Sequence, residues 1–156
     1  MDIEGLRKFL IDSNRAGYAG GEEKKWIKEP DGSTRIPFEK GEWRSDDHFY
    51  GGEPYVGMMI VSYESRAVWS MIYYGWVVEG VEAEAVYGIL RGALMQMPEE
   101  YPYRGPQEYK RGDFVYRNKW DGELDRFSGE ETIEQRGKLI YKADYRGGEV
   151  DKRRGV

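Results

Sequence analysis

The chain has 156 residues, the size of one domain that can bury a substantial core. It contains no cysteine and one histidine, so we expect no disulfide, no thiolate nucleophile, no metal and no other cofactor. The formal net charge of −5 argues against a phosphate-binding surface, so we expect no direct contact with nucleic acid.

Composition also bears on the cellular setting of the chain. No run approaches the ~20 apolar residues of a membrane helix, and the start Met1-Asp-Ile-Glu lacks the features of a signal peptide. We therefore expect a cytoplasmic protein without membrane contact. Charged residues make up 34% of the chain while Asn and Gln are rare, which favours a thermophilic source.

The N-terminal third predicts one helix followed by strands. Apolar side chains at helical spacing predict an amphipathic helix from Ile3 to Arg15. The anchors Trp26 and Ile27, the turn sequence at 30–33 and the run Thr34 to Phe38 predict a two-stranded ribbon. Residues 43–50 predict a further strand before the glycines of the next turn.

The centre of the chain holds a pattern that occurs twice. Residues 55–78 predict a β-hairpin around Glu64-Ser65-Arg66, and the pattern recurs at 127–150 with a spacing of 72 residues. Tyr55 then corresponds to Phe127, and Gly57 to Gly129. We interpret this as an internal duplication.

Between the two copies the sequence predicts a helix, a loop and a strand pair. The helix runs from Glu82 to Met97 and ends at Pro98. An irregular loop follows at 101–106. Strands are expected near 113–117 and 123–127, joined by a turn at Trp120-Asp121-Gly122.

This order predicts an α+β fold in which two α-β-β-β repeats form one antiparallel sheet with both helices packed on it. The whole of 1–156 is expected to be a single domain, with halves at roughly 1–78 and 79–150 and a solvated tail at 151–156.

Alternation along the strands predicts which side chains face the core. The expected core positions are Ala67, Trp69, Met71 and Tyr73 in the first copy and Leu139, Tyr141, Ala143 and Tyr145 in the second. The other face of the first copy is also apolar. Such a strand pair is either covered by the N-terminal ribbon or meets another subunit, and we expect one of these two arrangements.

One acid falls on the apolar side of the second copy. Glu131 shares its face with Phe127 and Ile133, so its carboxylate must find hydrogen-bond donors or stay protonated. It is either a structural acid or a ligand contact in a pocket. The corresponding residue of the first copy is Met59.

The other candidate binding residues are aromatic or charged. Trp69, Tyr73, Tyr141 and Tyr145 carry more polar tips than a plain core needs, which favours a lined cavity. Arg104 is placed to reach an anion or Glu131, with bracing of its loop as the alternative. Asp47 is a candidate partner, although the Asp46-Asp47-His48 run points to alternating faces and does not predict a metal site.

Several of these motifs together resemble a known family. They are Asp47-His-Phe-Tyr-Gly-Gly, Tyr55-x-Gly, Trp69-x-Met-x-Tyr-Tyr-Gly, Tyr103-Arg-Gly-Pro, Phe127-x-Gly-x-Glu and Tyr145-x-Gly-Gly. They resemble a prokaryotic domain family of unknown function that occurs alone or behind an Xre-type helix-turn-helix. The resemblance covers nearly the whole chain and implies association with transcription regulators. The family commonly carries an acid near position 58 or 59 as well, which this chain lacks.

Three functions remain open from the sequence. The first is a small-molecule-binding sensor or accessory domain whose aromatic pocket and inward acid suit a cationic or aromatic ligand. The second is a structural or interaction module that forms a homodimer through the 55–78 hairpin. The third is a hydrolase that uses Glu131 as general acid or base, although no paired nucleophile or catalytic residue is evident and no catalytic assignment is made.

Overall fold

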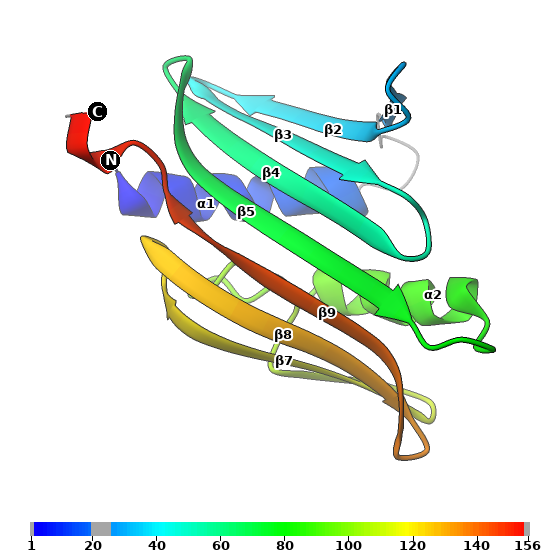
Figure 1. Ribbon diagram of the computed structural model, residues 1–156. Coiled ribbons are helices and arrows are strands. Elements are labelled where there is room, and N and C mark those ends of the chain that lie inside the picture. The colour runs from blue at the N-terminus through cyan, green and yellow to red at the C-terminus, as the bar shows by residue number, and fades with distance from the viewer. Residues whose placement is uncertain (1, 20–25, 155–156) are drawn as a thin grey trace.

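The computed structural model of the protein describes residues 2–19 and 26–154. A nine-stranded antiparallel sheet carries two α-helices, and both helices lie behind it in Figure 1. This confirms the predicted α+β class and the packing of both helices on the sheet. Neither described helix is long and apolar enough to cross a membrane.

The elements follow the chain in a helix-then-strands order that occurs twice. The first set is α1 (Ile3–Asn14), a π-helical turn (Arg15–Ala19), β1 (Ile27–Lys28), β2 (Thr34–Lys40), β3 (Trp43–Tyr50), β4 (Tyr55–Tyr63) and β5 (Arg66–Val77). The second set is α2 (Ala83–Leu94), β6 (Glu108–Arg111), β7 (Phe114–Glu123), β8 (Arg126–Gln135), β9 (Lys138–Glu149) and a 3-10 turn (Lys152–Arg154).

The first half contributes five consecutive strands to the sheet, β1 to β5, and the second half four, β6 to β9, whereas three were predicted for each repeat. The strand order is β1-β2-β3-β4-β5-β9-β8-β7-β6, so the two meanders meet at their last strands, β5 and β9. The short strand β6 lies in a charged stretch without alternation, which is why the sequence did not predict it. The predicted ribbon is present as β1 and β2, and it extends the edge of the sheet.

The two hairpins have the same pairing 72 residues apart. Tyr55 pairs with Gly75 as Phe127 pairs with Gly147, and both hairpins have a bulge at the corresponding place, after Val61 and after Ile133. Strands β5 and β9 then pair so that Tyr73 lies opposite Tyr145, two residues that also differ by 72. A pseudo-two-fold axis therefore passes between these two tyrosines.

The bulges explain where the predicted core faces were wrong. Ala67 and Leu139 were expected in the core and are exposed. Each lies beyond its bulge, where the extra residue reverses the alternation. The core positions near these hairpin ends are taken by Val68 and Ile140, which are 6% and 5% exposed.

The predicted turn at Trp120-Asp121-Gly122 was also wrong. These residues lie within β7, and the chain reverses at Leu124 and Asp125. Leu124 is buried, so an apolar residue occupies the turn that the polar Asp-Gly pair was expected to form. The longer strand β7 brings Asn118 onto the helix-covered face.

The helices use their apolar stripes to cover the two halves of that face. Helix α1 buries Leu6, Phe9 and Leu10, and α2 buries a stripe from Val86 to Leu94. The Glu82 side chain accepts hydrogen bonds from the amides of Glu84 and Ala85 and so caps α2. The residues packed under α1 and under α2 form two apolar clusters that meet along β5 and β9.

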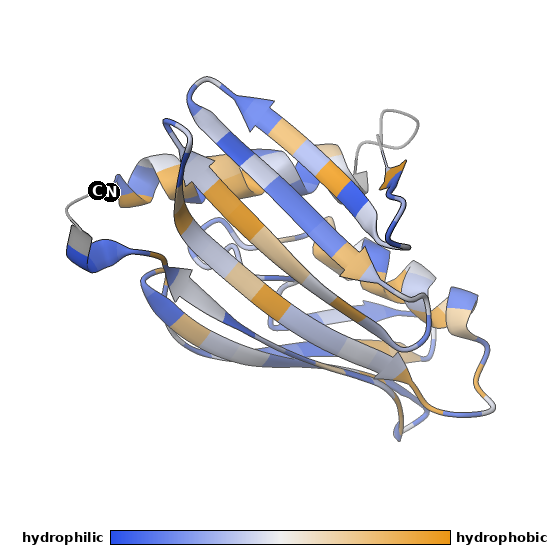
Figure 2. Cartoon of the chain, turned by 45° about the horizontal axis from the view of Figure 1, so that its top comes forward, coloured by the Kyte–Doolittle hydropathy of each residue, from blue (hydrophilic) through white to orange (hydrophobic). Residues whose placement is uncertain are grey.

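The opposite face of the first hairpin is apolar and open. Val56, Met58, Ile72 and Tyr74 are 45 to 48% exposed, and the apolar bands of β4 and β5 are visible in Figure 2. The described residues of the N-terminal ribbon continue the sheet at β3 and do not fold over this face. The described residues of the ribbon therefore do not cover the apolar face, which was one of the two predicted arrangements.

Aromatic rings lie directly over glycines of the neighbouring strand. A Cβ atom built on Gly57 would come within 2.3 Å of the Tyr73 ring, and one on Gly129 within 2.1 Å of the Tyr145 ring. The glycines of the Tyr55-x-Gly and Phe127-x-Gly motifs thus each leave room for the ring of a tyrosine on the neighbouring strand. Glycine is required at both positions.

Replacement of Gly57 or Gly129 by alanine should lower the free energy of unfolding by about 1–3 kcal/mol, because the added methyl group displaces a buried ring. Urea denaturation measures this change. Gly52→Ala is the matched control, since a Cβ there meets nothing within 4 Å. Equal stability of the three variants would contradict the ring-over-glycine account.

Candidate functional site

The seven residues singled out from the sequence all come from elements that meet near the pseudo-two-fold axis on the inner face. They are Asp47 on β3, Trp69 and Tyr73 on β5, Glu131 on β8, Tyr141 and Tyr145 on β9, and Arg104 in the loop between α2 and β6. Trp69 and Tyr141 correspond by the 72-residue spacing, as do Tyr73 and Tyr145. The aromatic residues of the cluster are therefore duplicated, whereas the two acids are not: Asp47 lies on β3 and Glu131 on β8.

Glu131 is fully buried and held by two donors. The Arg104 Nε donates to its Oε1 at 2.7 Å, and the Tyr116 hydroxyl donates to its Oε2 at 2.5 Å. Arg104 is itself only 5% exposed. A buried carboxylate with a guanidinium and a hydroxyl on its two oxygens is satisfied as an ion pair. Of the two roles considered for Arg104, the structure shows the contact with Glu131.

The loop that supplies Arg104 is fixed to strand β7 by two hydrogen bonds at Gly105. The amide of Gly105 donates to the Tyr116 hydroxyl at 3.1 Å, and the Asn118 Nδ2 donates to the Gly105 carbonyl at 2.9 Å. The Arg104 guanidinium also lies 5.4 Å from the centroid of the Tyr73 ring. The loop is therefore held on the sheet by the bonds at Gly105 as well as by the Arg104–Glu131 pair.

Tyr73 and Tyr145, the two tyrosines at the axis, each donate a hydrogen bond to a polar residue. The two acceptors lie on corresponding strands of the two halves, β3 and β7. Tyr73 donates to the Asp47 Oδ1 at 2.5 Å, and Tyr145 donates to the Asn118 Oδ1 at 2.7 Å. Asp47 pairs with Met59 in the sheet as Asn118 pairs with Glu131, so they occupy corresponding positions. The first half thus carries a carboxylate where the second carries an amide.

Sequence reasoning missed Asn118 and Tyr116. Asn118 is 2% exposed and Tyr116 is fully buried. Both lie on β7, where Tyr116 falls in the strand predicted near 113–117 and Asn118 falls between that strand and the turn predicted at 120–122. The alternation of Phe114, Tyr116 and Asn118 was the available signal, but a lone asparagine does not indicate a buried position.

Burial raises the pKa of the clustered tyrosine hydroxyls above the usual value of 10. At Tyr116 and Tyr141 the negative charge of Glu131 adds to burial as the next cause. The pKa of Tyr55, whose hydroxyl is hydrogen-bonded to that of Tyr141, is raised by burial and partly lowered by the Arg104 charge. These hydroxyls therefore act as hydrogen-bond donors and acceptors at neutral pH and not as phenolates.

A small cavity of about 50 Å³ lies beside this network, between the sheet and the ends of the two helices. Asp47 and Arg104 are the charged residues in its wall. The remaining walls are mostly apolar and include Trp69, Met59 and Tyr103. Glu131 is not among the lining residues, so it acts on the cavity only through Arg104.

Trp69 has a structural environment of its own. Its indole Nε1 donates to the Leu124 carbonyl at 2.9 Å, and its ring stacks on Phe127. Tyr103 also stacks on Phe127, with centroids 4.1 Å apart. These ring contacts hold the α2–β6 loop on the sheet, and Trp69 and Tyr103 line the cavity.

Asp46 and Asp47, which precede the single histidine, are not arranged with it as metal ligands. Asp46 lies on the outer face, where it accepts hydrogen bonds from Arg35 at 3.0 Å and Arg44 at 2.7 Å. Among the described residues, no group of three or more His, Asp and Glu side chains is arranged to hold a metal ion.

Replacement of Glu131 by methionine, the residue at the corresponding position 59, should lower the free energy of unfolding by about 3–5 kcal/mol because it leaves Arg104 buried without its carboxylate. The second substitution Arg104→Met should then restore much of the loss. Urea denaturation of the single and double variants measures the coupling. Additive losses would mean that the ion pair is not the interaction being removed.

The tyrosine cluster predicts a fall in stability at high pH. Below pH 10 the hydroxyls of Tyr116 and Tyr141 are protonated in both states, so their contribution is complete. Above pH 10 the unfolded chain loses protons that the folded chain keeps, so the free energy of unfolding decreases as the pH rises. Titration of tyrosinate absorbance should show these tyrosines ionising only as the fold is lost. Ionisation of all 13 tyrosines near pH 10 in the folded protein would contradict this.

Comparison with known proteins gives a family but no activity. Residues 47–150 match DUF5680, described as a domain of unknown function. No curated protein matches the chain. No solved structure matches it either. The matched region runs from Asp47 to the end of the second hairpin and contains all seven candidate residues, so it spans the inner-face network described above. Since the match covers about two thirds of the chain, the protein belongs to the DUF5680 family.

Proposed function

We propose that this protein is a small-molecule-binding sensor or accessory domain whose ligand carries a small cationic head group. The observation that carries the proposal is the cavity on the inner face, with the Asp47 carboxylate in a wall that also holds Arg104 and is otherwise mostly apolar, including the rings of Trp69 and Tyr103 and three methionines. Aromatic faces and a carboxylate together attract cations such as alkylammonium groups. The pocket is concave, mostly apolar and supplied with few polar groups, as ligand sites generally are.

The size of the cavity favours a cationic head over an aromatic ligand. About 50 Å³ accommodates a few water molecules or one small ammonium group. A drug-sized aromatic ligand needs a pocket of several hundred Å³. The proposed contacts are therefore Asp47 for the charge and Trp69 and Tyr103 for the alkyl or methyl groups, with Tyr73 fixing the carboxylate through its hydroxyl.

The Glu131–Arg104 pair supports the site without touching the ligand in this proposal. Arg104 lies in the cavity wall, and Glu131 neutralises its charge at 2.7 Å. An unneutralised guanidinium would repel a cation. Tyr141 and Tyr145 complete the network behind the wall through their bonds to Tyr55 and Asn118.

A hydrolase that uses Glu131 receives less support. Both oxygens of the carboxylate already accept hydrogen bonds, and the side chain does not line the cavity. A general acid or base must come within hydrogen-bond reach of its substrate. We therefore favour binding over catalysis.

We further propose that binding is read out by a transcription regulator. The support is the resemblance to domains that accompany Xre-type helix-turn-helix modules, which is an analogy between families and not a property of the site. In such an arrangement the domain would change the state of a DNA-binding partner.

Methylammonium, tetramethylammonium and choline chlorides, compared with sodium chloride at equal ionic strength, test the ligand class. The Tm of the protein should rise by several degrees when the cation concentration is a hundredfold above its Kd, because a ligand that binds only the folded state stabilises that state. Asp47→Asn copies Asn118 of the other half, keeps an acceptor for Tyr73 and should abolish the rise.

Asp125→Asn, at an exposed position in the turn between β7 and β8, is the matched control and should keep the response. A cation-induced shift of equal size in Asp47→Asn, or no shift with any of the three cations, would refute the proposal.

A further inference from the structure

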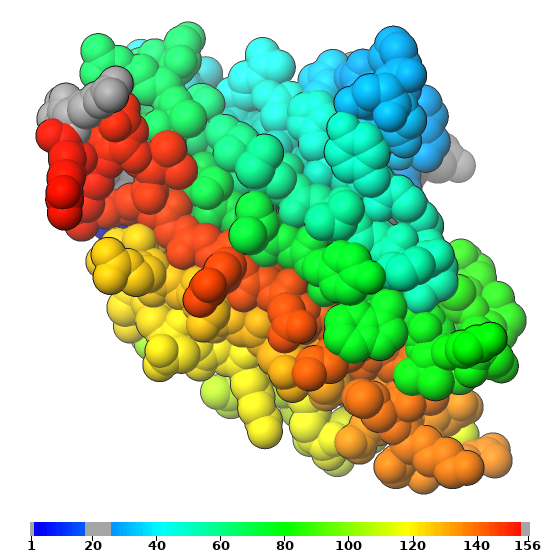
Figure 3. Space-filling view, in the orientation of Figure 1, coloured from blue at the N-terminus to red at the C-terminus, as the bar shows by residue number. Residues whose placement is uncertain are grey.

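The open face of the sheet carries an apolar patch beside a hollow. Both described helices lie on the other side, and the open face is the one seen in Figure 3. The patch comprises the exposed side chains of β4 and β5, with Val56, Met58, Ile72 and Tyr74 all 45 to 48% exposed. The hollow measures about 730 Å³ and extends from Tyr74 across β9 and β8 to Lys119 on β7.

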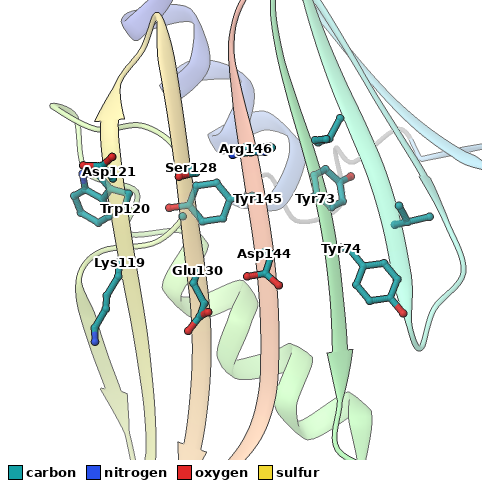
Figure 4. Close-up of a pocket in the computed structure, with 13 residues that line it drawn as sticks. Tyr73, Tyr74, Lys119, Trp120, Asp121, Ser128, Glu130, Asp144, Tyr145 and Arg146 are labelled. Atoms are coloured by element: carbon teal, nitrogen blue, oxygen red, sulfur yellow. The ribbon is translucent and has the colours of Figure 1, made fainter.

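The side chains around the hollow form two rows that cross the strands, as Figure 4 shows for those it labels. Strand pairing fixes the members of each row. The first row is Val56, Tyr74, Asp144, Glu130 and Lys119. The second row is Met58, Ile72, Arg146, Ser128 and Asp121.

The two rows have opposite signs of charge at corresponding places. On β9 the first row has Asp144 and the second Arg146, and on β7 the first row has Lys119 and the second Asp121. These four side chains are exposed. None of them makes a side-chain hydrogen bond or an ion pair within 4 Å to another described residue. Glu130, by contrast, is already paired with Lys142 at 3.1 Å.

We propose that the open face is a homodimer interface in which a second copy of this chain packs about a two-fold axis that runs across the strands between the two rows. Such an axis lays the first row of one copy on the second row of the other. Asp144 then meets Arg146 of the partner subunit, and Lys119 meets Asp121 of the partner subunit. Because a two-fold interface is self-complementary, each contact occurs twice.

The apolar part of the face obeys the same operation. Tyr74 meets Ile72 of the partner subunit, and Val56 meets Met58 of the partner subunit. Two more cross-strand pairs flank the two rows. Trp76 pairs with Lys142 beyond the first row, and Ser70 pairs with Gly148 beyond the second. The axis places the small pair against the large pair, so bulk and space are matched as well as charge.

The available area is sufficient for a stable dimer. Five neighbouring strands, β4, β5, β9, β8 and β7, form this face. With strands about 4.8 Å apart and about 33 Å for ten residues of each strand, the face has an area of roughly 800 Å². A partner contributes about this area to a standard interface. A membrane surface or a nucleic acid would favour one sign of charge here, whereas the face carries both in alternation.

Sedimentation equilibrium of the full chain tests the interface. The wild-type chain should be a dimer at tens of micromolar. Arg146→Asp sets an acid against Asp144 of the partner subunit at both symmetric contacts, and Asp144→Arg sets an arginine against Arg146 of the partner subunit, so each should raise the dimer Kd by roughly tenfold or more. The double variant D144R/R146D exchanges the rows and should dimerise like the wild type.

An equimolar mixture of the two single variants should form a heterodimer, because one has two acids and the other two arginines at the paired positions. This readout does not depend on either variant having the stability of the wild type, which circular dichroism checks separately. Lys8→Glu, an exposed reversal on α1, is the control and should leave dimerisation unchanged.

A wild-type chain that stays monomeric at several hundred micromolar would overturn the proposal. A dimer that persists in both single variants would place the interface elsewhere. A dimer lost in the singles but not recovered in the double variant or in the mixture would reject this two-fold axis. The assay contains no added cation ligand, so its failure is independent of the failure of the inner-face site.

Discussion

Glu131 is a carboxylate with no exposed surface, and a charge so placed must be surrounded by donors. Arg104 and Tyr116 meet this requirement, and in doing so they determine much of the inner face. Arg104 draws the α2–β6 loop onto the sheet, and Tyr116 and Asn118 hold the backbone of that loop at Gly105. The cavity between the helices exists beside a loop that is fixed in this way.

The duplication gives the protein two similar halves and lets them differ where it matters. Met59 and Asp47 stand in the first half where Glu131 and Asn118 stand in the second. The Glu131 position is consequently filled by an ion pair and an amide network, whereas beside the corresponding Met59 a small cavity remains with the Asp47 carboxylate in its wall. A symmetric scaffold thereby acquires a single, asymmetric site.

The two faces of the sheet have separate roles in our account. The inner face is enclosed by helices and holds the polar cluster, and the outer face presents apolar and alternately charged rows. Tyr73 and Tyr74 are neighbours on β5 that point to opposite faces, so a ligand site and a dimer interface would be separated by the thickness of one strand. A shift of β5 on ligand binding would therefore move Tyr74 and Ile72 at the dimer interface.

By itself, the sequence determined the α+β class, the two hairpins in equal register and the inward direction of Glu131, because periodicity and an ungapped repeat are local properties of the chain. Only the tertiary structure decided that Ala67 and Leu139 face solvent, since a bulge reverses alternation without a residue type that marks it. The partners of Glu131 also required the fold. Arg104 and Tyr116 lie 27 and 15 residues from it, and their meeting depends on how the loop crosses the sheet.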